Sequence, residues 1–137
     1  MKITMCGSLS RTMKAHLQHE KKMQTCYEKL AFAGHTVYSI FAVPSRRDDG
    51  YTPEQKQMLD LLHLAKIEES DAIFVVDVHG DISESTKREI LWAEIRGKRI
   101  YYYSDNTDLN DYGLLRCANK YATVVNTFPG VIPNVPL

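Results

Sequence analysis

The sequence predicts a single α/β domain over residues 1–137, flavodoxin-like or Rossmann-like, with a five-stranded parallel sheet in the order 2-1-3-4-5 and helices on both faces. Two observations predict this fold. Segments of β-type residues alternate with segments of helical periodicity along the chain, which is typical of parallel strands joined by right-handed helical crossovers. The run AIFVV at 72–76 is continuously apolar, as a central strand buried on both faces should be. The expected strands are 2–6, 36–40, 72–76, 99–103 and 122–126, and the expected helices are 11–33, 53–69, 83–96 and 109–120.

Glycines and changes of periodicity bound the first three elements. Gly7 stops the β-type run KITMC, and apolar residues then recur at helical spacing as far as Gly34, which is a C-terminal stop signal. TVYSI at 36–40 returns to a β-type pattern, and the polar segment 44–51 that follows is expected to be a loop.

The later elements carry similar signals. Thr52 and Pro53 are an N-cap and a first-turn proline, so they open the helix that ends near Glu69. Gly97 ends the helix that begins near Ser83. The strand at 99–103, the helix at 109–120 and the strand at 122–126 then continue the alternation of strand and helix.

The composition excludes several classes of protein. The chain has 17 basic and 17 acidic residues among 137, with 44% apolar residues, so it is expected to be soluble, without the basic footprint of a nucleic-acid binder. No apolar run approaches the ~20 residues that span a bilayer, and no signal peptide is evident, which favours a cytoplasmic location. Three cysteines without CxxC spacing are expected to be free thiols, and no metal-ligand spacing such as HExxH occurs, so no metal is expected.

The predicted topology places a ligand at the carboxyl ends of the strands, where the strand order reverses between the first and third strands. The loop at 7–11, GSLSR, combines a glycine, two hydroxyls and a following helix N-terminus, which suits an anion; it is equally consistent with a tight turn. The loop at 77–85 lies at the same edge.

Glu89 lies just inside the helix that follows this second loop, beside the hydroxyls of Ser83 and Ser85. A carboxylate next to anion-binding hydroxyls suits chemistry at a sugar carbon, because it can stabilise or capture an oxocarbenium-like centre. A simpler interpretation is helix capping, with Ser85 or Thr86 as the cap and Glu89 three residues beyond Thr86.

Several segments of the chain resemble a known family. SDAIFVVD at 70–77, SESTKREILWA at 83–93 and GKRI at 97–100 resemble the nucleoside 2-deoxyribosyltransferase-like superfamily. CGS at 6–8, with Arg11, is similar to the N-terminal motif of its deoxynucleoside 5'-monophosphate N-glycosidase branch. The element order agrees over the whole chain, while the specific motifs occupy only part of it.

The resemblance implies that Glu89 is the nucleophile at the anomeric carbon. At the position of Ser83 the transferases carry an aspartate for the sugar 5'-hydroxyl, and the monophosphate glycosidases carry a serine for the phosphate, so a phosphorylated substrate is expected. No cofactor is implied. The residues expected to bind the nucleotide are Gly7, Ser8, Arg11, Asp77, Ser83 and Ser85.

The sequence departs from the family at three places. Thr4 stands where the family has a tyrosine, His63 stands where it has the aspartate that contacts the leaving base, and Ser85 and Lys87 replace glycines. An imidazole that titrates near neutrality could protonate the departing base, so His63 is a candidate general acid, with His79 as its alternative; an ordinary helix histidine is the competing interpretation.

The sequence is compatible with three functions: an N-glycosidase or transferase acting on a nucleotide, a nucleotide sensor without turnover, and a flavodoxin-like domain that binds a flavin or a partner. The third leaves Glu89 unexplained. The proline-rich segment 128–137 is expected to be an extended arm that packs on a neighbouring subunit, and the resemblance likewise implies a homodimer or larger homo-oligomer.

Overall fold

A parallel four-stranded sheet in the order β2-β1-β3-β4 forms the centre of the computed structural model. The structure describes residues 1–7, 13–39, 52–77, 82–107, 113 and 115. The strands are β1 (Lys2–Cys6), β2 (Thr36–Tyr38), β3 (Ala72–Val75) and β4 (Arg99–Tyr102), and the helices are α1 (Met13–Phe32), α2 (Pro53–Glu69), α3 (Glu84–Ile95) and a short 3₁₀ helix at Tyr103–Asp105.

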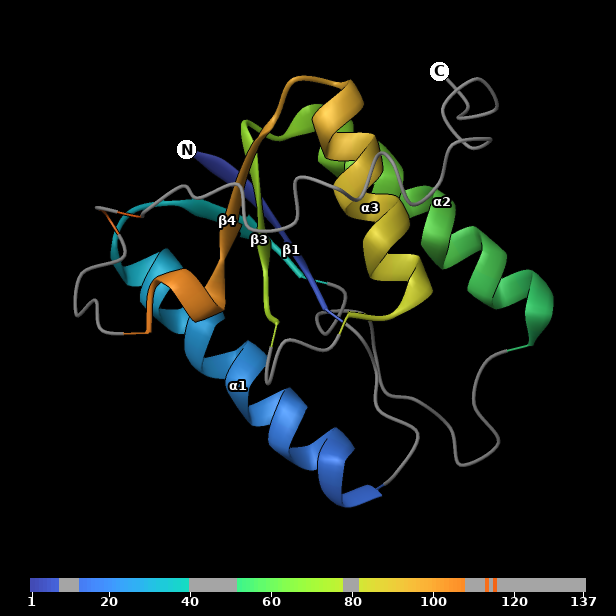
Figure 1. The fold of residues 1–137 in the computed structure, drawn as a ribbon, viewed down its shortest axis with the longest axis horizontal. Helices are drawn as coiled ribbons and strands as arrows, with labels where there is room; N and C mark the ends of the chain where they lie inside the picture. Colours follow the sequence, from blue (N-terminus) through green and yellow to red (C-terminus); the bar gives the residue numbers. More distant parts are fainter. Residues whose placement is uncertain (8–12, 40–51, 78–81, 108–112, 114, 116–137) are drawn as a thin grey trace.

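Helices cover both faces of this sheet (Figure 1). On one face Met23, Cys26 and Leu30 of α1 pack with Ile3 and Phe74. On the other face α2 and α3 pack against the strand residues whose side chains point to the opposite side of the sheet. These include Cys6, Ile73, Val75 and Tyr102. β3 is buried at every position, as a central strand between two helical layers must be.

The predicted strand order is confirmed for the four strands that the structure describes. Strand β1 pairs in parallel with both β2 and β3, with Cys6 opposite Val75, so the order reverses at the carboxyl end of β1. The predicted fifth strand at 122–126, the helix at 109–120 and the arm at 128–137 lie outside the described residues.

The start of α2 agrees closely with its sequence signals. Thr52 is the N-cap, and it forms a reciprocal capping box with Gln55: the Thr52 hydroxyl accepts from the Gln55 amide at 3.1 Å, and the Gln55 side chain accepts from the Thr52 amide at 2.9 Å. Pro53 occupies the first turn, where its missing N–H costs nothing.

Several strand and helix ends differ from the prediction by one or two residues; β2, for example, ends at Tyr38 and β3 at Val75. The end of β4 and the cap of α3 each have a local reason. Strand β4 ends at Tyr102 and not at Tyr103, because both the amide and the hydroxyl of Ser104 donate to the Asp77 carboxylate and hold this segment in a 3₁₀ turn. Helix α3 is capped by Ser83 and not by Ser85 or Thr86, since the extended backbone of Ser83 lets its hydroxyl accept from the Thr86 amide at 3.2 Å.

No helix within the described residues is both long enough and apolar enough to cross a bilayer.

Candidate active site

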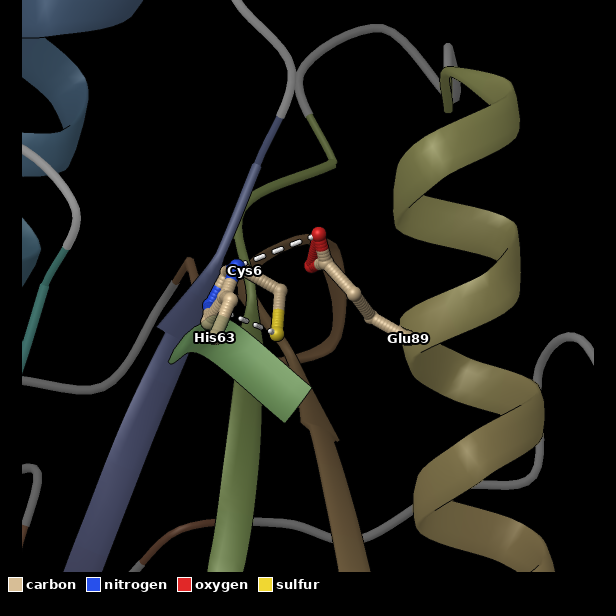
Figure 2. Close-up of side chains that lie close together, drawn as sticks. All are labelled: Cys6, His63 and Glu89. Atoms are coloured by element: carbon tan, nitrogen blue, oxygen red, sulfur yellow. Dashed lines mark hydrogen bonds and ion pairs between the residues drawn. The ribbon is translucent and has the colours of Figure 1, made fainter. Parts of the chain in front are cut away.

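Three side chains from three elements meet at the carboxyl edge of the sheet (Figure 2). Cys6 is the last residue of β1, His63 lies on α2, and Glu89 lies in the second turn of α3 with its carboxylate directed at the imidazole. All three are buried. The structure therefore joins the two predicted catalytic residues, His63 and Glu89, although 26 positions separate them in the sequence.

Both nitrogens of His63 face oxygen atoms that accept hydrogen bonds. Nε2 lies 2.9 Å from the carbonyl oxygen of Met5, and Nδ1 lies 3.2 Å from Oε1 of Glu89. A carbonyl oxygen cannot donate, so Nε2 carries a proton, and a carboxylate at Nδ1 favours a second proton there. The side chains of His63 and Glu89 are only 4% and 11% exposed. The pair is therefore a buried imidazolium–carboxylate contact.

The pKa of His63 reflects two opposing effects. Burial by itself lowers the pKa, because it disfavours the charged imidazolium. The charge and hydrogen bond of the Glu89 carboxylate act in the opposite direction, as do the Met5 carbonyl and Asp60, and together these effects outweigh burial and raise the pKa of His63. The protonated form is thus favoured by the fold.

This raised pKa predicts how stability depends on pH. Unfolded His63 titrates near its usual value of about 6.5, so between that value and the higher folded pKa the native state holds more protons than the unfolded state. The stabilisation is complete below about pH 6.5 and is lost as pH rises through the folded pKa.

Urea unfolding should show this decline as the pH rises above about 6.5. Glu89→Gln removes the largest cause that raises the pKa, so the decline should be absent in that variant. An identical decline in both proteins would assign the effect to a different group.

Cys6 closes the cluster on the β1 side. Its Sγ lies 3.8 Å from Nε2 of His63. Burial, together with the nearby Glu89 carboxylate, raises the pKa of the Cys6 thiol well above its usual range. Neither Cys6 nor Cys26 is in a disulfide, as the sequence predicted, whereas Cys117 lies outside the described residues.

One oxygen of Glu89 is left without a partner within the described part of the chain. Oε1 faces His63, while Oε2 is buried and accepts no hydrogen bond. Buried polar atoms are usually satisfied, so an exception calls for a functional explanation. A carboxylate oxygen is a nucleophile that can form a covalent bond to an electrophilic carbon.

The start of α3 gathers the hydroxyls expected to bind an anion. Ser83 Oγ lies 3.4 Å from the hydroxyl of Ser85 and 3.1 Å from that of Thr86. The Thr86 and Lys87 amides already bond to Ser83, whereas the amides of Glu84 and Ser85, in the first turn, have no acceptor within the helix. Glu89 lies about 7.5 Å along the helix axis from Glu84, the first residue of α3.

The other residues predicted to bind substrate are Asp77, Gly7, Ser8 and Arg11. Asp77 is buried after β3, and its carboxylate accepts from the Ser104 amide at 2.9 Å and the Ser104 hydroxyl at 2.5 Å, which gives it a structural role. Gly7 directly follows β1 and is partly exposed at the sheet edge. Ser8, Arg11 and the alternative acid His79 lie outside the described residues.

Thr4, which stands where the family has a tyrosine, also has a structural role. Ser70 donates its hydroxyl to the Lys66 carbonyl at 2.7 Å, so the Thr4 hydroxyl at 2.6 Å is the donor to Ser70. This pair ties β1 to the C-terminal end of α2.

Sequence reasoning did not find the contribution of Cys6 or of the Met5 carbonyl to this site. The sequence carries one signal for Cys6: it is the last residue of the first strand, at the carboxyl edge of the sheet, and its side chain points to the face opposite that of Met5. The ligand-bearing atoms of Cys6, His63 and Glu89 lie within 4.8 Å of one another, so they form a group that could hold a metal ion.

The comparisons with known proteins identify the fold. No protein-family model matches the sequence, and no curated protein matches it. Among solved structures, the chain is similar to the Clostridium botulinum CMP N-glycosidase BcmB, with a TM-score of 0.50 and 22% identity over 74% of this chain and 70% of that one. It is also similar to a 2-deoxyribosyltransferase from Bacillus psychrosaccharolyticus, with a TM-score of 0.56 and 20% identity over 74% of this chain and 71% of that one. The chain therefore shares the fold of these two enzymes, which is the fold that the resemblance implied.

Proposed function

We propose that this protein cleaves the base–sugar bond of a nucleoside 5'-monophosphate with Glu89 as the nucleophile. The observation that carries the proposal is the buried Glu89 carboxylate, which has one oxygen held by His63 and the other without a partner among the described residues. Its place at the reversal point of the sheet is where this class of fold binds ligands. The two similar structures, an N-glycosidase and a 2-deoxyribosyltransferase, support glycosyl cleavage or transfer.

The chemistry follows from the two oxygens of Glu89. The free Oε2 attacks the anomeric carbon as the bond to the base breaks, which gives a glycosyl–enzyme ester and a base that takes up a proton. Water then cleaves the ester and restores the carboxylate. Transfer would occur if a second base replaced that water.

His63 acts in this proposal as a positioning residue for Glu89. The sequence suggested that it protonates the departing base, but its two ring nitrogens face Met5 and Glu89. Its imidazolium fixes Oε1 through a charge-assisted contact and so orients Oε2. The proton for the base then comes from another donor.

The phosphate is assigned to the N-terminus of α3. The hydroxyls of Ser83 and Ser85 and the amides of the first turn present donors and a positive dipole end. The 5'-phosphate and the anomeric carbon of one nucleotide would then lie along the same helix, at its end and at its second turn.

Incubation with a panel of nucleoside 5'-monophosphates, followed by chromatography of free bases, tests the proposal. We expect base release, with a monophosphate preferred over its nucleoside. Binding without release would favour the nucleotide sensor, and equal turnover of nucleoside and nucleotide would contradict the phosphate assignment.

Ser83 offers a sharper test of that assignment, because its hydroxyl also caps α3. Ser83→Ala removes both the cap and the phosphate contact, and it should lower stability by about 1 kcal/mol. Ser83→Asp keeps a good cap but places a negative charge where the phosphate binds. We expect Ser83→Asp to melt like the wild type while kcat/KM for the monophosphate falls about 10- to 100-fold, from the loss of about 1.5–3 kcal/mol.

The nucleoside is the matched substrate for both variants. Its kcat/KM should change much less than that of the monophosphate. Parallel losses on both substrates would place the phosphate elsewhere.

A further inference from the structure

Cys6 is the one member of the buried cluster that the proposed reaction does not use. Its Sγ lies 3.8 Å from Nε2 of His63, and one ligand atom from each of Cys6, His63 and Glu89 lies within 4.8 Å of the other two. A thiolate, an imidazole and a carboxylate are the three ligand types that zinc accepts in proteins. The absence of a local ligand spacing in the sequence does not bear on this group, because β1, α2 and α3 each supply one member.

His63 has the orientation of a metal ligand. Its Nε2 faces the Met5 carbonyl at 2.9 Å, which is the backbone contact that fixes the tautomer of many metal-bound histidines and leaves Nδ1 as the ligand atom. Nδ1 lies 3.2 Å from Oε1 of Glu89. Two ligands with bonds of about 2.1 Å to one tetrahedral ion lie about 3.4 Å apart, so the spacing of Nδ1 and Oε1 matches that of two ligands of one ion.

The charge balance of the cluster also permits a metal. Without one, a neutral thiol, an imidazolium and a carboxylate sum to zero. With a divalent cation, a thiolate, a neutral imidazole and a carboxylate again sum to zero, so the buried site acquires no net charge.

We propose that Cys6, His63 and Glu89 form a binding site for a thiophilic divalent cation such as Zn²⁺. Binding releases two protons to solvent, one from the Cys6 thiol and one from between His63 and Glu89, and the three protein atoms each form a bond to the ion. The second oxygen of Glu89, which is buried and accepts no hydrogen bond within the described residues, or a water molecule completes four-coordination.

The regulatory consequence rests on the proposed function. An ion held by Glu89 occupies the electron pairs that would attack the anomeric carbon. Metal-bound protein is therefore inactive, and removal of the ion restores base release.

Cobalt is the probe for this site, because a thiolate bound to Co²⁺ gives a charge-transfer band in the near ultraviolet. The full chain is stripped of metal and titrated with Co²⁺ in the variant Cys26→Ala/Cys117→Ala, which retains Cys6 as its only cysteine. Cys26 is the matched control, since it is an equally buried cysteine that packs on the other face of the sheet. We expect one Co²⁺ per chain, a thiolate band and displacement by Zn²⁺.

The complementary variant is Cys6→Ala, with its fold checked by circular dichroism. It should lose the band completely, and the sensitivity of base release to Zn²⁺ should be lost with it. A folded Cys26→Ala/Cys117→Ala protein without the band would overturn the proposal, as would an unchanged band in Cys6→Ala.

The two proposals fail separately. Co²⁺ binding in a protein that releases no base from any nucleotide would retain the metal site and contradict the enzyme. Base release in a protein that binds no Co²⁺ would do the opposite.

Discussion

Glu89→Gln is expected to abolish base release while the protein stays folded. The amide has almost the shape of the carboxylate, and its oxygen can still accept a hydrogen bond from Nδ1 of His63 at the observed 3.2 Å spacing. It has no charge with which to stabilise or capture the anomeric carbon. The loss should be on the order of 10⁴-fold or more, as when one member of a catalytic group is removed.

The measurement is the rate at which free base appears from a nucleoside 5'-monophosphate, beside a thermal melt followed by circular dichroism. Glu94→Gln is the matched control, because it removes a partly buried carboxylate from the same helix, one turn further on and outside the cluster. Near wild-type turnover by Glu89→Gln would remove Glu89 from the mechanism.

His63→Leu is expected to give the largest loss of stability. It leaves the Glu89 carboxylate buried without its counter-charge and the Met5 carbonyl without its donor. Removal of one partner of a buried pair costs about 3–5 kcal/mol, which is a large part of the stability of an ordinary domain. Urea unfolding measures the change, and base release should fall with it because Oε1 is no longer fixed.

A double-mutant cycle separates the ion pair from simple packing. Glu89→Leu alone leaves a buried imidazole, whereas His63→Leu/Glu89→Leu removes both charges and fills much of the space with apolar atoms. We expect the double variant to be more stable than either single one, since two apolar groups can replace a buried pair at little cost. Additive losses would show that the two side chains do not interact.

Local rules accounted for most of the element order. The capping box of Thr52 and Gln55 and the first-turn Pro53 act within one turn of chain, so the start of α2 could be read directly from the sequence. The same is true of Gly34 and Gly97, which adopt the positive φ of helix C-terminal ends. In contrast, β4 ended one residue early because of Asp77, which is 27 positions away from Ser104.

For the site, the sequence and the resemblance singled out Glu89 and His63, because the position of each could be matched to a motif. They did not show that the two side chains touch, with Nδ1 of His63 at 3.2 Å from Oε1 of Glu89. That depends on how α2 and α3 pack on one face of the sheet.

The sequence by itself determined which segments become strands and helices, and which residue types gather at the carboxyl edge, since periodicity, caps and turns are properties of neighbouring residues. The tertiary structure alone decided the Cys6–His63–Glu89 cluster. Hydrogen-bond direction, burial and shared charge depend on atoms brought together from β1, α2 and α3, and no spacing along the chain encodes these contacts.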